Sequence, residues 1–126
     1  MESIGLRIVL CLTFTIGGAL IVWALRSAAS GRLRRNHYVG IRTATTMASD
    51  EAWTVAHRAG RPLTETGGWL MIVAGLAALV PMPESALTTV TVAGVVALGG
   101  FTGAGAWVGI RAARALPGDE AGNPDA

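Results

Sequence analysis

Residues 85–110, SALTTVTVAGVVALGGFTGAGAWVGI, form a run of 26 residues without a charged side chain. Residues 8–25, IVLCLTFTIGGALIVWAL, form a second uncharged run of 18 residues. Roughly 20 apolar residues, each rising about 1.5 Å along a helix, are enough to cross the hydrocarbon core of a bilayer. Only 14% of all residues are charged, against about 25% in ordinary soluble domains. The sequence therefore predicts an all-α membrane protein.

We expect three transmembrane helices, at residues 4–25, 67–82 and 87–110. The first and third are apolar enough to insert unaided, whereas the second has few strongly apolar residues and depends on its neighbours. Pro81 and Pro83 are expected to stop this second helix. Residues 1–115 then form a single three-helix membrane domain. The polar tail 116–126 contains Pro and Gly and is expected to be disordered.

The arginines predict the orientation in the membrane. Seven of the ten lie in the 26–66 loop, two follow the third helix, and Arg7 alone lies at the outer end of the first. Short loops rich in Lys and Arg stay in the cytoplasm. We therefore expect the N-terminus outside and both the 26–66 loop and the C-terminus inside. A cleavable signal peptide is the alternative for the first run, but Arg26 directly after 18 apolar residues favours a helix that stays in the membrane.

A short amphipathic helix is expected within the loop, over residues 50–59. Ser49 is a suitable N-cap, because its side-chain oxygen can accept a hydrogen bond from a free N–H of the first turn. Gly60 and Pro62 are expected to end the helix. So short a helix needs support from packing. We expect it to lie along the inner membrane surface with Trp53 inserted into the interface.

The third apolar run contains two pairs of glycines spaced four apart. They are Gly99 with Gly103, and Gly105 with Gly109. Small residues at this spacing let two membrane helices approach closely. The neighbour is either another helix of the same chain, a second copy in a homo-oligomer, or a larger membrane partner.

A dozen residues of the loop form one extended pattern: Asn36, Tyr38, Gly40, Ile41, Arg42, Thr43, Thr46, Ser49, Trp53, His57, Arg58 and Gly60. We call them the signature residues. The pattern resembles the cytoplasmic signature of the SdpI family, named for the immunity protein that guards a sporulating bacterium against its own secreted killing factor. One apolar run before the signature and two after it also fit that family, so the resemblance covers roughly residues 5–112. Arg35 stands where the family commonly has Pro, and the immunity protein's additional N-terminal membrane half has no counterpart here.

The resemblance implies a bacterial plasma-membrane protein whose cytoplasmic loop binds a partner, such as a cytosolic regulator, in immunity or signalling. Arg42, Trp53, His57 and Arg58 are then the first candidates for the binding surface, since Arg suits bidentate contacts with carboxylates. A structural accessory subunit of a larger membrane complex is the alternative function.

The same signature residues are equally compatible with an internal, architectural role. In that case Arg42 is expected to pair with an acid of the loop, either Asp50, Glu51 or Glu65. Both interpretations remain open at the level of the sequence.

Enzymatic function is not expected, and we assign no catalytic, cofactor-binding or metal-binding residues. His37 and His57 both lie in the loop, and Cys11 is the single cysteine, so no metal-ligand cluster is recognisable. No phosphate-binding glycine loop and no Ser/His/Asp set is recognisable either. The net charge of +2 comes from arginines that flank membrane helices, so we expect the lipid bilayer, and no nucleic acid, as a partner.

Overall fold

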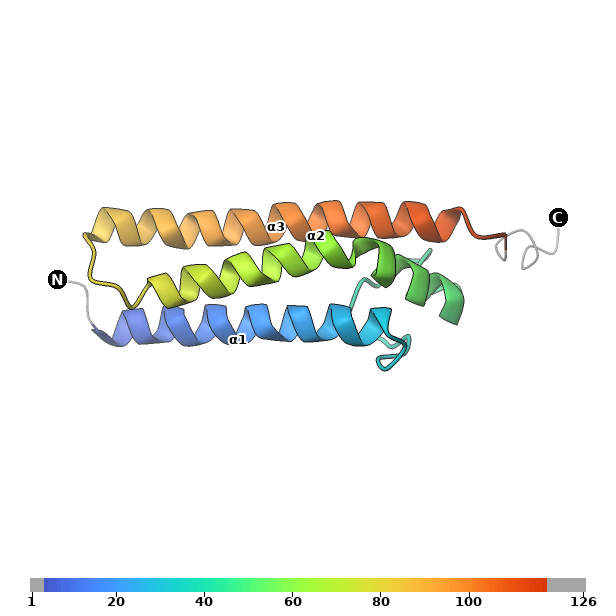
Figure 1. The fold of residues 1–126 in the computed structure, drawn as a ribbon, viewed down its shortest axis with the longest axis horizontal. Coiled ribbons are helices and arrows are strands. Elements are labelled where there is room, and N and C mark those ends of the chain that lie inside the picture. Colours follow the sequence, from blue (N-terminus) through green and yellow to red (C-terminus); the bar gives the residue numbers. More distant parts are fainter. Residues whose placement is uncertain (1–3, 118–126) are drawn as a thin grey trace.

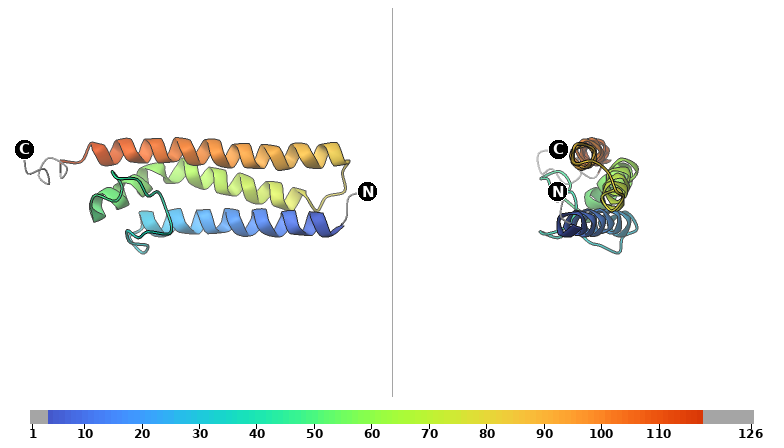
Figure 2. Two further views of the ribbon diagram at one scale, coloured as in Figure 1. Left: turned by 180° about the vertical axis from the view of Figure 1, so that it is seen from behind. Right: turned by 90° about the vertical axis from the view of Figure 1, so that its left-hand side faces the viewer.

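A computed structural model of the chain describes residues 4–117, which form three helices: α1 (Ile4–Ala29), α2 (Asp50–Ala77) and α3 (Glu84–Arg114). Successive helices are antiparallel, and α2 lies between α1 and α3 and packs against both (Figure 1). It keeps this position when the bundle is seen end-on (Figure 2). Residues 4–117 contain no β-strand. The all-helical prediction is confirmed, while the expected disordered tail lies, apart from Leu116 and Pro117, outside the described residues.

Two of these helices are long and apolar enough to cross a bilayer. The most apolar 18-residue windows of α1 and α3 have mean hydropathies of 2.4 and 1.6. Within residues 4–117, α2 does not meet the same criterion. It carries Arg61 and Glu65 near its middle, and polar or small residues surround them.

The ends of the helices follow from local chemistry. α1 ends where Gly31 adopts φ +85°, a left-handed conformation that residues with a side chain rarely take. Ser49 caps α2, because its Oγ accepts a hydrogen bond from the Ala52 N–H at 2.9 Å. This cap was predicted from the sequence. Pro83 directly precedes α3, and its extended backbone, with ψ 154°, sets the start of the helix at Glu84.

The predicted division of the 50–82 region is wrong. The structure has one helix, α2, where the sequence suggested an interfacial helix over 50–59 and a separate helix over 67–82. Proline inside a helix removes one N–H donor but keeps a helical φ, so it bends a helix that other contacts hold. The ring of Pro62 is exposed, and α2 changes direction in its N-terminal half (Figure 1). The helix then ends at Ala77 rather than Met82.

Glycines allow α2 to approach both of its neighbours. A Cβ atom on Gly18 of α1 would lie 2.5 Å from the Gly68 carbonyl oxygen of α2. On the other side, Gly60 of α2 lies against the backbone of Gly105 in α3, where a Cβ atom on Gly60 would overlap the Gly105 carbonyl. No side chain fits at these two crossings. The close contact with Gly105 helps α2 continue as one helix through the position where the sequence suggested an end.

Arg7 joins the beginning of α1 to the end of α2. Its guanidinium donates to the carbonyl oxygens of Ala78 at 3.2 Å, Val80 at 2.9 Å and Met82 at 2.8 Å. The last carbonyls of a helix have no partner within the helix. One arginine therefore satisfies three carbonyls of the 78–83 turn, more than 70 residues away in the sequence.

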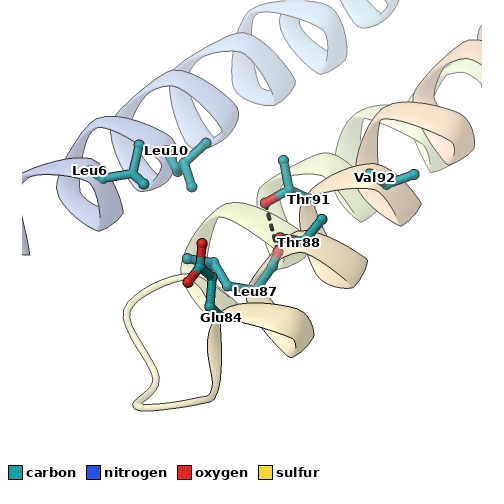
Figure 3. A pocket seen from close by; sticks show the side chains of 7 residues that line it. All are labelled: Leu6, Leu10, Glu84, Leu87, Thr88, Thr91 and Val92. Carbon is teal, nitrogen blue, oxygen red and sulfur yellow. Dashed lines mark hydrogen bonds between the residues drawn. The ribbon is translucent and has the colours of Figure 1, made fainter. Parts of the chain in front are cut away.

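A groove of about 230 Å³ separates α1 from α3 beside this turn. Leu6 and Leu10 line its α1 side, while Leu87, Thr91 and neighbouring residues of α3 line the other (Figure 3). The Thr91 hydroxyl donates to the Leu87 carbonyl at 2.8 Å, so it has a partner within its own helix. α1 and α3 consequently make little direct contact here, and α2 connects them.

Candidate functional site

The signature residues gather at one end of the bundle, where the 30–49 loop folds back onto α2. Trp53 and His57 are one turn apart on α2, and both side chains are buried, with 1% and 0% of their surface exposed. Their ring centroids lie 4.2 Å apart. The Trp53 Nε1–H donates to the Leu33 carbonyl at 2.9 Å. The expectation that Trp53 inserts into the membrane interface is therefore wrong, because the loop covers its ring.

Both ring nitrogens of His57 are engaged, one with the loop and the other within α2. The Ile41 backbone N–H donates to Nε2 at 2.9 Å, so Nε2 is an acceptor without a proton. Nδ1 lies 2.7 Å from the Trp53 carbonyl oxygen, which can only accept, so Nδ1 carries the proton. This pair of partners selects the neutral ring. Burial lowers the pKa of His57 below 6.5, although the hydrogen bond to the Trp53 carbonyl acts in the opposite direction.

Gly40 allows the loop to lie directly on these two rings. Its φ is +102°, which disfavours any residue with a side chain. A Cβ atom at this position would lie 2.7 Å from His57 Nε2 and 2.7 Å from Trp53 Cη2. Both the backbone conformation and the available space therefore require glycine.

The threonines of the signature fold the 41–46 segment. Thr46 is fully buried, and its hydroxyl donates to the Ile41 carbonyl at 2.7 Å while accepting from the Thr43 N–H at 2.9 Å. The Thr46 N–H in turn donates to the Thr43 hydroxyl at 3.2 Å. Hydroxyls replace the missing backbone partners of this irregular segment, which gives the loop a defined shape.

Of two further signature residues, one shapes the loop and the other joins α2 to α1. The Asn36 carboxamide oxygen accepts from the N–H groups of Tyr38 and Val39, both at 2.9 Å, which makes a tight turn. The Arg58 Nε–H donates to the Ala29 carbonyl at 2.7 Å and so satisfies a group at the end of α1.

The outward side of the loop carries a different set of groups. Tyr38 has 84% of its surface exposed, and Arg34, His37 and Arg42 are also exposed. The Arg42 guanidinium donates to the His37 carbonyl. Two of the three acids that Arg42 was expected to contact have other partners, since Arg35 pairs with Asp50 and two arginines of the helices pair with Glu65.

The glycines of α3 divide into two groups. Gly105 and Gly109 pack against α2, where Gly109 lies against the backbone of Ala56. At Gly99 and Gly103, no atom lies within 4 Å of the position that a Cβ would occupy. Gly105 and Gly109 therefore contact a helix of the same chain, and Gly99 and Gly103 face open space.

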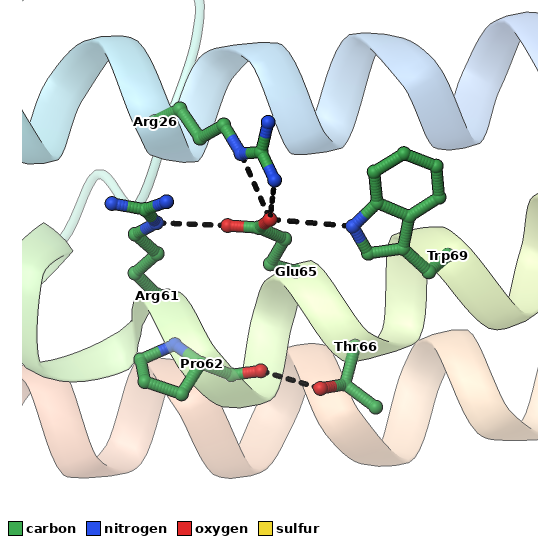
Figure 4. A network of polar contacts seen from close by, with 6 residues as sticks. All are labelled: Arg26, Arg61, Pro62, Glu65, Thr66 and Trp69. Carbon is green, nitrogen blue, oxygen red and sulfur yellow. Dashed lines mark hydrogen bonds and ion pairs between the residues drawn. The ribbon is translucent and has the colours of Figure 1, made fainter.

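Sequence reasoning missed a network centred on Glu65 (Figure 4). Its Oε1 accepts from Arg26 Nε at 2.8 Å and from Trp69 Nε1 at 3.2 Å, and Arg61 Nε donates to Oε2 at 2.8 Å. Desolvation alone would raise the pKa of Glu65, but hydrogen bonds from Arg26, Arg61 and Trp69 outweigh it and lower the pKa to about 2. The spacing of four residues on each side of Glu65 was a signal available in the sequence.

The described residues offer little for metal or acid–base chemistry. No group of three or more His, Cys, Asp or Glu is close enough to hold a metal ion within residues 4–117. Both nitrogens of His57 are engaged with backbone groups, so this ring has no free lone pair or proton for a substrate. The hydrogen bond that His57 accepts from Ile41 instead helps to hold the 30–49 loop on α2.

Comparison with known proteins identifies the family. A model of the SdpI/YfhL protein family matches residues 32–110, which include all the signature residues, α2 and most of α3. No curated protein and no solved structure matches the chain. The match covers well over half of the sequence and agrees with the resemblance of the signature. This chain is a member of the SdpI/YfhL family.

Proposed function

We propose that this chain is an immunity-type membrane protein that binds a partner protein through the exposed side of its 30–48 loop, in the cytoplasm of a bacterium. Membership of the SdpI/YfhL family supports the immunity type. The observation that carries the binding role is the contrast between the two sides of the loop. Its inner side is locked to His57 and Trp53, while Tyr38 on its outer side is 84% exposed.

The proposal includes three membrane crossings, with the N-terminus outside. α1 and α3 are apolar enough to span the bilayer, and α2 lies between them over its whole C-terminal half. Nine arginines lie in the loop or in the helical ends beside it, whereas Arg7 lies at the opposite end. Positive charge of this kind retains a segment in the cytoplasm.

The exposed groups also suit protein recognition. Tyrosine and arginine are enriched among residues that dominate binding energy at interfaces. Arg34 and Arg42 are exposed on the same loop as Tyr38, so the matching partner surface is acidic. A loop already fixed by internal hydrogen bonds loses little conformational entropy when it binds.

Crosslinking followed by purification from native membranes tests this proposal. Tyr38→Ala should leave the amount of protein in the membrane unchanged and abolish recovery of the partner. Trp53→Ala should instead reduce the amount of folded protein, since it removes a buried ring. A partner recovered equally well with Tyr38→Ala, or a reporter fused near Ser49 that is active outside the cytoplasm, would refute the proposal.

A role as accessory subunit of a membrane complex is the second candidate, and one face of α3 favours it. Gly99, Gly100 and Gly103 have open space around them, and Val95 and Val96 beside them are more than half exposed. A neighbouring membrane helix would fit closely against such a face. Gly103→Leu should then prevent a membrane protein, or a second copy of this chain, from copurifying, without affecting binding at the loop.

A further inference from the structure

Two adjoining cavities lie where α1, α2 and the start of the loop meet. One, of about 420 Å³, is lined by Ala19, Val22, Trp23, Arg26, Arg32, Trp69 and Ile72. The other, of about 540 Å³, is lined by Arg58, Arg61, Pro62, Glu65, Thr66 and Trp69. Trp69 borders both, so it forms a wall between an apolar cavity and a basic one.

The first cavity is amphipathic along the helix axis. Its apolar lining comes from residues 19–23 of α1 and from Ile72 of α2. Arg26 and Arg32 lie at the end nearest the loop. Trp23 and Trp69 are about half exposed on this side. Tryptophan is common at the level of lipid headgroups, where its ring is apolar and its N–H remains polar. A molecule that fills this cavity therefore has an apolar part and a polar end.

The charge at the polar end is positive. Four arginines line the two cavities, and Glu65 is the only acid that lines either of them. Glu65 is occupied by Arg26 and Arg61 (Figure 4). Arg32 is exposed and makes a single local hydrogen bond, from its Nε to the Ser30 hydroxyl at 3.1 Å, so its remaining N–H groups have no partner among the described residues. Positive charge thus exceeds negative charge by three, which favours an anionic group such as a phosphate.

We propose that these cavities bind an anionic phospholipid, such as phosphatidylglycerol, from the leaflet beside the loop. An acyl chain lies along Val22, Trp23 and Ile72, and the phosphate lies beside Arg32 and the outer edges of Arg26 and Arg61. Basic pockets between membrane helices recognise anionic headgroups in this way. The inference rests on membrane insertion and not on the binding of a protein partner.

Native mass spectrometry of the full chain, purified in detergent, tests the proposal. The probes are phosphatidylglycerol and phosphatidylcholine with identical acyl chains. Native protein should retain phosphatidylglycerol preferentially, and Arg32→Gln should reduce this retention about fivefold, the effect of one arginine near a lipid surface. Arg34→Gln is the matched control, because it removes the same charge two residues away and lines neither cavity. Equal retention of both lipids, or equal losses in both variants, would overturn the proposal.

A second measurement keeps the test independent of any effect of Arg32 on folding. Brominated lipids quench tryptophans that they contact. Brominated phosphatidylglycerol should quench native protein more than brominated phosphatidylcholine does. Trp23→Phe should reduce this difference to the part that Trp69 contributes. Trp107→Phe should keep the full difference, since Trp107 is exposed on α3 and lines neither cavity. A difference that is unchanged in Trp23→Phe and disappears with Trp107→Phe would place the lipid elsewhere and overturn the proposal. Loss of a protein partner at the loop would leave both results unchanged.

Discussion

Replacing Gly40 by alanine tests whether the signature residues hold the loop on α2. Two separate penalties apply to this substitution. Alanine at φ +102° is strained by about 1–2 kcal/mol. Its Cβ would also lie 2.7 Å from both His57 Nε2 and Trp53 Cη2, an overlap in a packed site that costs roughly 1–3 kcal/mol more. The total of about 2–5 kcal/mol corresponds to an increase of roughly 30-fold to several thousand-fold in the open population of the loop.

Hydrogen exchange at the Ile41 amide measures this population, because that N–H donates to His57 Nε2. Gly31→Ala provides a matched control. Gly31 has a similar φ of +85°, but no atom lies within 4 Å of its Cβ position, so only the strain applies. Ile41 should therefore exchange much faster in Gly40→Ala than in Gly31→Ala. If its exchange rate is the same in both variants, the packing of Gly40 on the two rings does not hold the loop, and the reasoning fails.

Acid and loss of a single arginine should also weaken the structure in defined ways. The pKa of Glu65 is lowered from 4.5 to about 2, so its contribution to stability is complete above pH 4.5 and is lost as the pH falls toward 2. Glu65→Gln should therefore flatten the dependence of the melting temperature on pH in that window. An unchanged dependence would contradict the network. His57 has a lowered pKa in the folded state, so its side chain takes up a proton more readily in the unfolded chain, and the folded loop loses stability as the pH falls below 6.5. After correction for intrinsic exchange, protection of the Ile41 amide against hydrogen exchange should decrease below pH 6.5. His57→Gln should abolish this pH dependence. Arg7→Gln should lower the free energy of unfolding in detergent by about 1–3 kcal/mol, because three carbonyls lose a charged donor. Arg114→Gln, at the exposed end of α3, should have little effect. Equal effects of the two substitutions would exclude a specific role for Arg7.

Hydropathy and local capping predicted the parts of this fold that depend on neighbours in the sequence. The apolar runs around Cys11 and Gly99 became α1 and α3, and Ser49 caps the helix that follows it. These features are set within a few residues, so periodicity and residue type are sufficient to find them.

The features that sequence reasoning missed depend on partners far along the chain. α2 continues through Pro62 because Gly60 packs on Gly105, and nothing near Pro62 in the sequence indicates that contact. Arg26 reaches Glu65 across the 30–49 loop. Trp53 was predicted to insert into the membrane interface, but the loop covers its ring in the folded chain. An amphipathic pattern shows which face is apolar, and only the tertiary structure shows what covers that face.

The central position of α2 has a consequence for biosynthesis. The least apolar helix has its neighbours on both sides, and one of them, α3, is made after it. In the three-crossing arrangement proposed above, insertion one helix at a time would leave α2 in lipid without the close packing of Gly60 and Gly67 against α3. The proposed arrangement therefore favours cooperative insertion, in which α2 enters the bilayer together with α3 as a helical hairpin.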